Sequence, residues 1–118
     1  MKNDVVHTKS KSFAIRIVNA YKFLTSDKKE FILSKQLVRS GTAIGALVRE
    51  SEFAQSKKDF LNKMYIALKE TNETQYWLEI LHETDFLKTS EYNSLSADCI
   101  ELIKLLVSIT KTTKNKLD

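Results

Sequence analysis

The chain contains no proline, two glycines and one cysteine among its 118 residues. Because few residues interrupt regular secondary structure, we expect long helices joined by short connections. The single cysteine, Cys99, excludes an internal disulfide and favours a reducing compartment, which we take to be the cytoplasm. No apolar run approaches the roughly 18 residues that a membrane span requires, and the polar first residues lack the apolar core of a signal peptide.

The composition is ordinary for a folded, water-exposed protein. Hydrophobic residues make up 42% of the chain and charged residues 29%, which fits one domain, residues 1–118, around a single core. The net charge of +4 permits an anionic partner without requiring one. We expect the polar tail, about residues 112–118, to fray.

Hydrophobic spacing predicts four amphipathic helices. Apolar residues recur at alternating steps of three and four, which keeps one seam of each helix buried in a bundle. The helices are expected near residues 4–25, 28–54, 57–84 and 90–113. Their short connections favour antiparallel neighbours, so the predicted fold is all-α, an antiparallel up-down-up-down four-helix bundle.

Polar residues between these segments are candidate helix caps. The candidates are Asp27 with Glu30 for the second helix, Ser56 with Asp59 for the third, and Thr89 or Ser90 for the fourth. A break is expected around Asp85 to Lys88.

Both glycines, Gly41 and Gly45, fall inside the second predicted helix. Each interior glycine costs about 1 kcal/mol relative to alanine, so the pair needs a structural reason. At positions i and i+4 they share one face, where missing side chains let another helix approach closely. The nearby Arg39 and Arg49 argue against a membrane-spanning helix that dimerises through Gly-x-x-x-Gly.

The second and third helices each carry a second stripe besides the predicted buried seam. The seams are Leu37, Gly41, Ile44, Val48 and Ser51, then Leu61, Met64, Leu68, Thr71, Gln75, Leu78 and His82. The second stripes are Ile32, Arg39, Ala43, Ala46, Glu50 and Phe53, then Ile66, Glu70, Glu73, Trp77 and Ile80. A lone bundle should carry charges there. One interpretation places these residues at the edge of a broad core. The one we favour is a subunit interface, with Arg39 available to Glu50, Glu70 or Glu73.

Lysines are unevenly distributed between the two ends of the predicted bundle. The chain ends and the connection between the second and third helices share one pole. The candidate nucleic-acid-binding residues at this pole are Lys9, Lys11, Lys57, Lys58, Lys111 and Lys114. A solvated surface with ordinary helix-end lysines is the alternative. No aromatic residue is interleaved with these lysines, which argues against base stacking as a recognition mode.

Catalytic templates find little support. Glu79 and His82 form one Glu-x-x-His motif, whereas a di-iron bundle needs two such motifs and further carboxylates. Cys99 lies on the buried seam of the fourth helix and is expected to act as a small hydrophobic residue. His82 is expected to end the buried seam or to cap the last turn of the third helix. We therefore expect no enzymatic activity, no metal and no cofactor.

Two stretches resemble the signatures of the bacterial "four helix bundle protein" family, encoded within intervening sequences of 23S ribosomal RNA genes. The first is residues 36–46 with Arg49 and Glu50. The second comprises residues 58–60, 66–70, 72–74 and 76–78. One departure is that many relatives carry Ser and Asn where this chain has Ala43 and Leu47, so a polar role is not expected at these positions.

The resemblance implies an up-down bundle that assembles into a ring of five subunits, without enzymatic activity or cofactor. The chain is also similar to the accessory protein of diversity-generating retroelements, a basic pentamer that binds nucleic acid and a reverse transcriptase. Two functions therefore remain open. One is a homo-oligomeric accessory protein that binds RNA or a reverse-transcriptase-type complex, and the other is a structural or protein-docking ring without nucleic-acid affinity.

Overall fold

The computed structural model describes residues 2–117, with side chains from residue 4 onward. Its four α-helices are α1 (Lys2–Ser26), α2 (Leu33–Ser51), α3 (Lys57–Glu83) and α4 (Thr89–Leu117). No strand occurs within residues 2–117. The prediction of an all-α fold with four helices is confirmed. Helix α4 continues to Leu117 through most of the segment that we expected to fray, and Asp118 lies outside the described residues.

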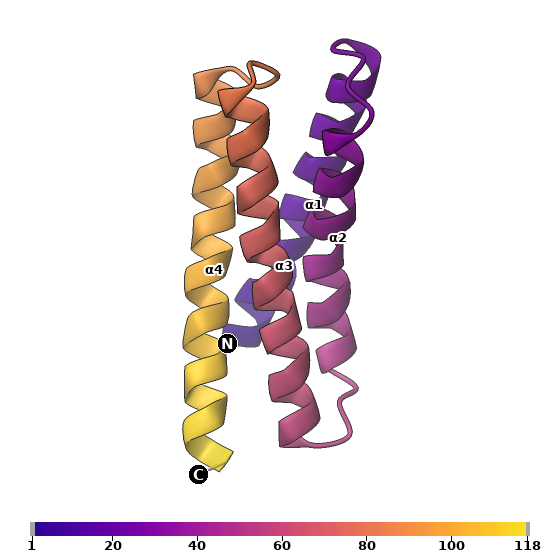
Figure 1. Cartoon of the computed structure of the whole chain (residues 1–118). Coiled ribbons are helices and arrows are strands. Elements are labelled where there is room, and N and C mark those ends of the chain that lie inside the picture. The colour runs from indigo at the N-terminus through magenta and orange to yellow at the C-terminus, as the bar shows by residue number, and fades with distance from the viewer. Residues whose placement is uncertain (1, 118) are drawn as a thin grey trace.

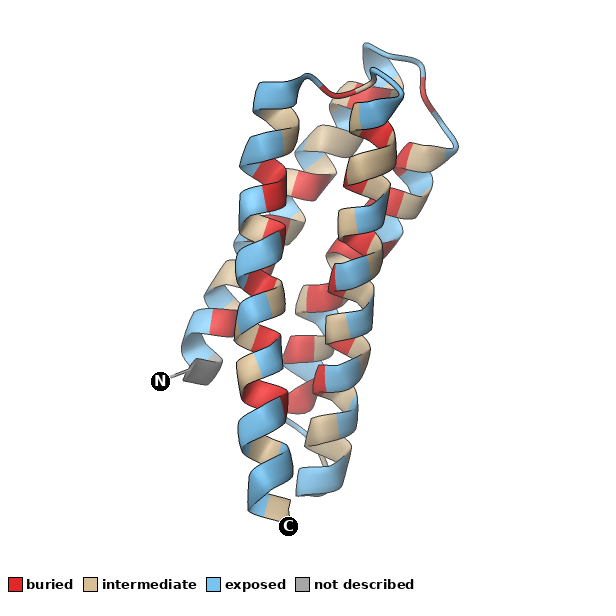
Figure 2. Ribbon diagram, turned by 60° about the vertical axis from the view of Figure 1, so that its left-hand side comes forward, coloured by how far each residue is buried: buried red, intermediate tan, exposed pale blue. Residues whose placement is uncertain are grey.

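The helices lie side by side along the long direction of a molecule that measures 48 × 21 × 20 Å (Figure 1). The α1–α2 and α3–α4 loops lie at one end, whereas the α2–α3 loop and the C-terminus lie at the other (Figure 1). Helix α2 packs against α1 and α3, and α4 packs against α3 and α1. Each helix therefore has two neighbours, and buried residues line the inward sides of all four (Figure 2).

The buried seam of α2 is as predicted, whereas that of α3 is rotated. Leu37, Gly41, Ile44, Val48 and Ser51 are all buried in α2. The buried residues of α3 are Met64, Ala67, Thr71, Thr74, Leu78 and Leu81. Of the predicted α3 seam, Leu61, Leu68, Gln75 and His82 are only partly buried. The reason is that α3 packs on both α2 and α4, so its buried face widens toward the α2 side.

The predicted close crossing at the glycines is confirmed at Gly41. A Cβ atom built on Gly41 would lie 2.8 Å from Cγ2 and 3.2 Å from Cβ of Ile17. Ile17 is fully buried on α1, so it has little room to move. A Cβ atom on Gly45 would lie 3.4 Å from the Ser10 carbonyl oxygen, an ordinary van der Waals contact. Gly41 therefore sets how closely α1 and α2 approach.

Helix α2 begins at Leu33, later than predicted, because Glu30 rather than Asp27 caps it. The Glu30 carboxylate accepts hydrogen bonds from the backbone N–H groups of Ile32, Leu33 and Ser34 at 3.2, 3.0 and 2.7 Å. Burial alone would raise the pKa of Glu30, but these donors outweigh it and lower that pKa below its usual range. Asp27 accepts from the hydroxyl of the adjacent Ser26 instead.

Of the caps predicted for the last two helices, that of α3 is confirmed and that of α4 is wrong. Ser56 Oγ accepts from the backbone N–H of Asp59 at 3.1 Å, which confirms the predicted cap of α3. At the start of α4 the predicted caps Thr89 and Ser90 are wrong, because both residues already belong to the helix. The Glu91 carboxylate instead accepts from the backbone N–H of Lys88 at 2.9 Å.

We predict that Gly41→Leu destabilises the chain by roughly 1–3 kcal/mol, because the new side chain overpacks the contact with Ile17. Urea denaturation followed by circular dichroism measures the effect. Gly45→Ala is the control and should leave stability unchanged or raise it by up to about 1 kcal/mol, because its Cβ makes an ordinary contact and alanine favours the helix. Equal stability of Gly41→Leu and the parent would contradict a close crossing.

We predict that Glu30→Gln destabilises the chain by about 0.5–2 kcal/mol at neutral pH, the usual range for a helix cap. The pKa of Glu30 is lower in the folded chain than in the unfolded chain. The stability that its carboxylate adds is therefore present above the unfolded-state pKa and is lost as the pH falls through the folded-state pKa. The difference from the parent should therefore shrink in acid, as urea titrations at a series of pH values would show. Asp27→Asn should have little effect, and a pH-independent difference for Glu30→Gln would contradict the charged cap.

Candidate assembly face and basic pole

We call the predicted interface residues of α2 and α3 the assembly face. Its most prominent members are Ile32 and Phe53, which flank the two ends of α2 and are 76% and 81% exposed. Arg39 and Glu50 are also exposed, and Ala43 is partly buried. Two large apolar side chains therefore remain uncovered at opposite ends of one helix.

A polar network joins α2 to α3 within the assembly face. Arg39 Nη2 donates to Glu73 Oε2 at 2.6 Å, and Arg39 Nη1 lies 4.0 Å from Glu70 Oε2. Trp77 Nε1 donates to the same Glu73 oxygen at 3.0 Å. The predicted pairing of Arg39 with glutamates of α3 thus occurs inside one chain. Glu50, the other predicted partner of Arg39 at the interface, lies 3.4 Å from Lys63 within the single chain.

The second stripe of α3 flanks the core instead of lying opposite to it. Ile66, Glu70, Glu73, Trp77 and Ile80 are all partly buried, and Trp77 packs against the hydrophobic core. The interpretation that these residues form the edge of a broad core therefore describes Trp77 well. One oxygen of the stripe, Glu70 Oε1, is buried without a hydrogen-bond partner among the described residues.

We call the end that carries the α2–α3 loop and the C-terminus the basic pole (Figure 1). Its exposed predicted lysines are Lys57, Lys58, Lys111 and Lys114, whereas the exposed Lys11 lies farther from this end, beside Gly45 in the middle part of α2. None of them forms an ion pair within the described part of the chain. Lys9 differs, because its ammonium group lies 3.1 Å from Glu101 and its charge is partly compensated. The unpaired charges are those available to an anionic ligand.

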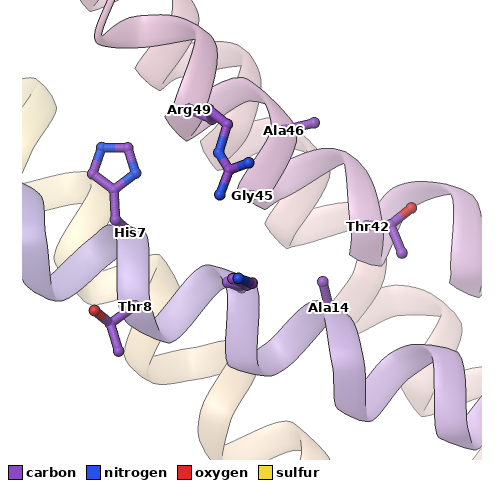
Figure 3. Close-up of a pocket in the computed structure, with 8 residues that line it drawn as sticks. His7, Thr8, Ala14, Thr42, Gly45, Ala46 and Arg49 are labelled. Carbon is purple, nitrogen blue, oxygen red and sulfur yellow. The ribbon is translucent and has the colours of Figure 1, made fainter.

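A groove of about 460 Å³ runs between α1 and α2. Its small side chains are Ala14 and Ala46 beside Gly45, and its basic side chains are His7, Lys11 and Arg49. Figure 3 shows His7 and Arg49 extending from facing helices toward the space between them. His7 Nε2 lies 2.7 Å from a Glu52 oxygen. Of these three basic residues the sequence predicted only Lys11 as a binding residue. His7 and Arg49 come close to Lys11 only because α1 packs against α2.

A second groove, of about 550 Å³, lies between α3 and the end of α4. Lys58, Asn62 and Tyr65 line it from α3, and Lys114 and Leu117 line it from α4. The expectation that no aromatic residue accompanies the lysines is therefore wrong in three dimensions. The signal was present in part, because Lys58 and Tyr65 stand seven residues apart and share a helix face.

The side chains of Cys99 and His82 make contacts within the fold. Cys99 is buried and its Sγ donates to the Thr71 carbonyl oxygen at 3.3 Å. Burial, followed by the nearby Asp98 and Glu79 carboxylates, raises the pKa of Cys99 to about 12. The His82 ring stacks on Tyr92 with 4.5 Å between ring centroids.

The described residues contain no cluster of three or more His, Cys, Asp or Glu that could hold a metal ion. Nor does any helix among them have the length and apolar character to cross a membrane.

The four packed helices and the cationic end define a small all-α protein of the helical-bundle class. The sequence profile of the 23S rRNA-intervening sequence protein family matches residues 2–108, so the chain belongs to that family, as its signatures predicted. It is similar to a crystal structure of a protein with unknown function from the S23 ribosomal protein family of Bacteroides thetaiotaomicron VPI-5482. The two chains share 57% sequence identity, and their structures match with a TM-score of 0.93 over 94% of this chain and 99% of that chain. No curated protein matches this chain. Neither family name denotes an enzyme.

Proposed function

We propose that this chain is a non-enzymatic subunit of a homopentameric ring that binds RNA through its basic pole. The observation that carries the proposal is the group of exposed lysines at one end of the molecule without acidic partners among the described residues. A lysine that lacks a carboxylate partner keeps its full charge for phosphate groups. The family name refers to an intervening sequence of 23S rRNA and names no ligand, and we choose RNA as the polyanion of this proposal because of that genetic association.

Ring formation would multiply this charge. We propose an up-down-up-down bundle, which the placement of the three loops in Figure 1 supports. In a closed ring whose axis runs roughly along the helices, symmetry brings every basic pole to one rim. The combined field would exceed that of a single subunit and would draw RNA toward the rim. Binding mainly to phosphates should be weakly sequence-specific and strongly dependent on salt.

The assembly face supplies the proposed contact between subunits. Ile32 and Phe53 are the proposed anchors, because apolar side chains buried on association carry much of the binding free energy. The half-exposed pair of Arg39 and Glu73 shapes the surface between them. Contacts in a cyclic pentamer are heterologous, so this face would dock on a different surface of the neighbouring subunit.

A ring that docks proteins and has no nucleic-acid affinity is the second candidate. It is favoured by apolar side chains that stay exposed outside the assembly face, such as Ile100 and Val107 on α4, which are 42% and 46% exposed. Seven residues apart, the two lie on the same face of the helix. This candidate predicts an intact oligomer that does not bind RNA.

We predict that the double variant Ile32→Asp/Phe53→Asp dissociates the oligomer and keeps its far-UV helicity. Both side chains are largely exposed in the single chain, so their loss should spare the fold. Sedimentation equilibrium at tens of micromolar measures the mass, and Ser12→Asp on α1 is the control for an added carboxylate. A monomeric parent would contradict the ring, and an unchanged double variant would place the interface elsewhere. Variants of Arg39 or Trp77 are less specific, because these residues also join α2 to α3.

We predict that Lys57→Glu/Lys58→Glu leaves the oligomer intact and sharply weakens RNA binding. Fluorescence anisotropy of a labelled RNA in low salt measures the affinity, and a salt titration should lose a slope of about one for each phosphate-binding lysine removed. Lys22→Glu/Lys88→Glu carries the same charge change at the opposite end and should have a much smaller effect. Equal effects of both pairs would contradict a localised site, and a parent that binds no RNA would favour the docking ring.

A further inference from the structure

The groove between α3 and α4 combines several kinds of chemistry at the basic pole. Two of its residues, Lys58 and Lys114, are cationic and belong to different helices. Asn62 carries an amide that both donates and accepts hydrogen bonds, and Leu61 and Leu117 provide apolar walls. Tyr65 adds an aromatic ring to the same lining. The combination of cations, an amide and a ring matches the parts of a nucleotide.

The Tyr65 ring is available for stacking. It is 39% exposed, and it has no ring contact or hydrogen bond within the described part of the chain. Two other tyrosines are engaged: Tyr76 contacts Trp77 edge to face, and Tyr92 stacks on His82. The groove volume of about 550 Å³ lies within the range of sites for small organic ligands. A planar group can therefore enter the groove and lie against Tyr65.

We infer that this groove binds a nucleotide of single-stranded RNA, with the base stacked on Tyr65 and the flanking phosphates held by Lys58 and Lys114. The inference rests on the proposed function and assigns it a substrate class. Bases in a duplex are covered on both faces by their neighbours, whereas unpaired bases can stack on an aromatic side chain. An exposed Tyr65 side chain in a groove that two lysines also line should therefore select unpaired strands.

The α1–α2 groove offers a contrast within the same molecule. Its basic residues, His7, Lys11 and Arg49, surround small side chains, and its lining contains no Phe, Tyr or Trp. Such a groove attracts phosphates of single strands and duplexes alike. Any preference for single strands should therefore depend on Tyr65.

The test compares a labelled single-stranded RNA with a duplex of the same length by anisotropy in low salt, using the assembled full chain. Tyr65→Ala should weaken single-strand binding by roughly ten- to a hundredfold, as expected for loss of base stacking, and should leave duplex binding unchanged. Tyr65→Phe should retain the parent affinity. The matched control is Tyr76→Ala, on the same face of α3 and about 16 Å further along the helix; it should change neither affinity.

A second measurement does not depend on any variant. A single strand with abasic sites keeps its phosphates but cannot stack, so the parent should bind it roughly ten- to a hundredfold more weakly than the intact strand. Equal binding of intact and abasic strands overturns the inference, as does a Tyr65→Ala protein with unchanged or uniformly reduced affinity for both RNAs. The proposed function survives these results if Lys57→Glu/Lys58→Glu still weakens binding. A parent that binds neither RNA overturns both.

Discussion

The close contact between Gly41 of α2 and Ile17 of α1 is the constraint on which the rest of the molecule depends. Any side chain at position 41 would occupy the space that Ile17 fills. This approach lets the seams of both helices join one core, since Ile17 and Ile44 are both fully buried. It also brings His7 and Lys11 of α1 opposite Arg49 of α2, so that packing in the interior creates the cationic groove on the surface (Figure 3).

The contact between α2 and α3 uses polar groups to orient the outer surface. A buried hydrogen bond of 2.9 Å joins the hydroxyls of Thr74 and Ser40, and the Arg39–Glu73 pair lies farther out on the same side. A half-exposed ion pair adds little to stability, generally less than about 1 kcal/mol. Its clearer consequence is geometric. It holds the polar part of the assembly face in place while Ile32 and Phe53 stay exposed beyond it.

The two ends of the molecule differ in the balance of their acidic and basic residues. At the end with the α1–α2 and α3–α4 loops, Glu30 and Glu91 cap helices, and Lys28 lies over the Phe23 ring. That end also carries Asp27, Glu83 and Asp85, so acidic residues offset its lysines in number. At the basic pole the exposed lysines have no ion-pair partner in the described residues, and Lys58 and Lys114 line a groove between α3 and α4. This difference is the physical basis for the proposal that RNA binds at one end, whereas the inferred preference for single strands rests on Tyr65.

The sequence by itself determined what depends on neighbours one or two turns apart. Periodic apolar residues specified four helices and the seam of α2, and Ser56 marked the start of α3 correctly. The start of α2 was misplaced because Asp27 resembles a cap, whereas the chain passes through a positive φ at Lys29 and uses Glu30. Only the tertiary structure decided which face of α3 is buried and which residues meet Tyr65. Those outcomes depend on which helices pack together, and Lys114 is too distant in sequence from Tyr65 for any local pattern to relate them.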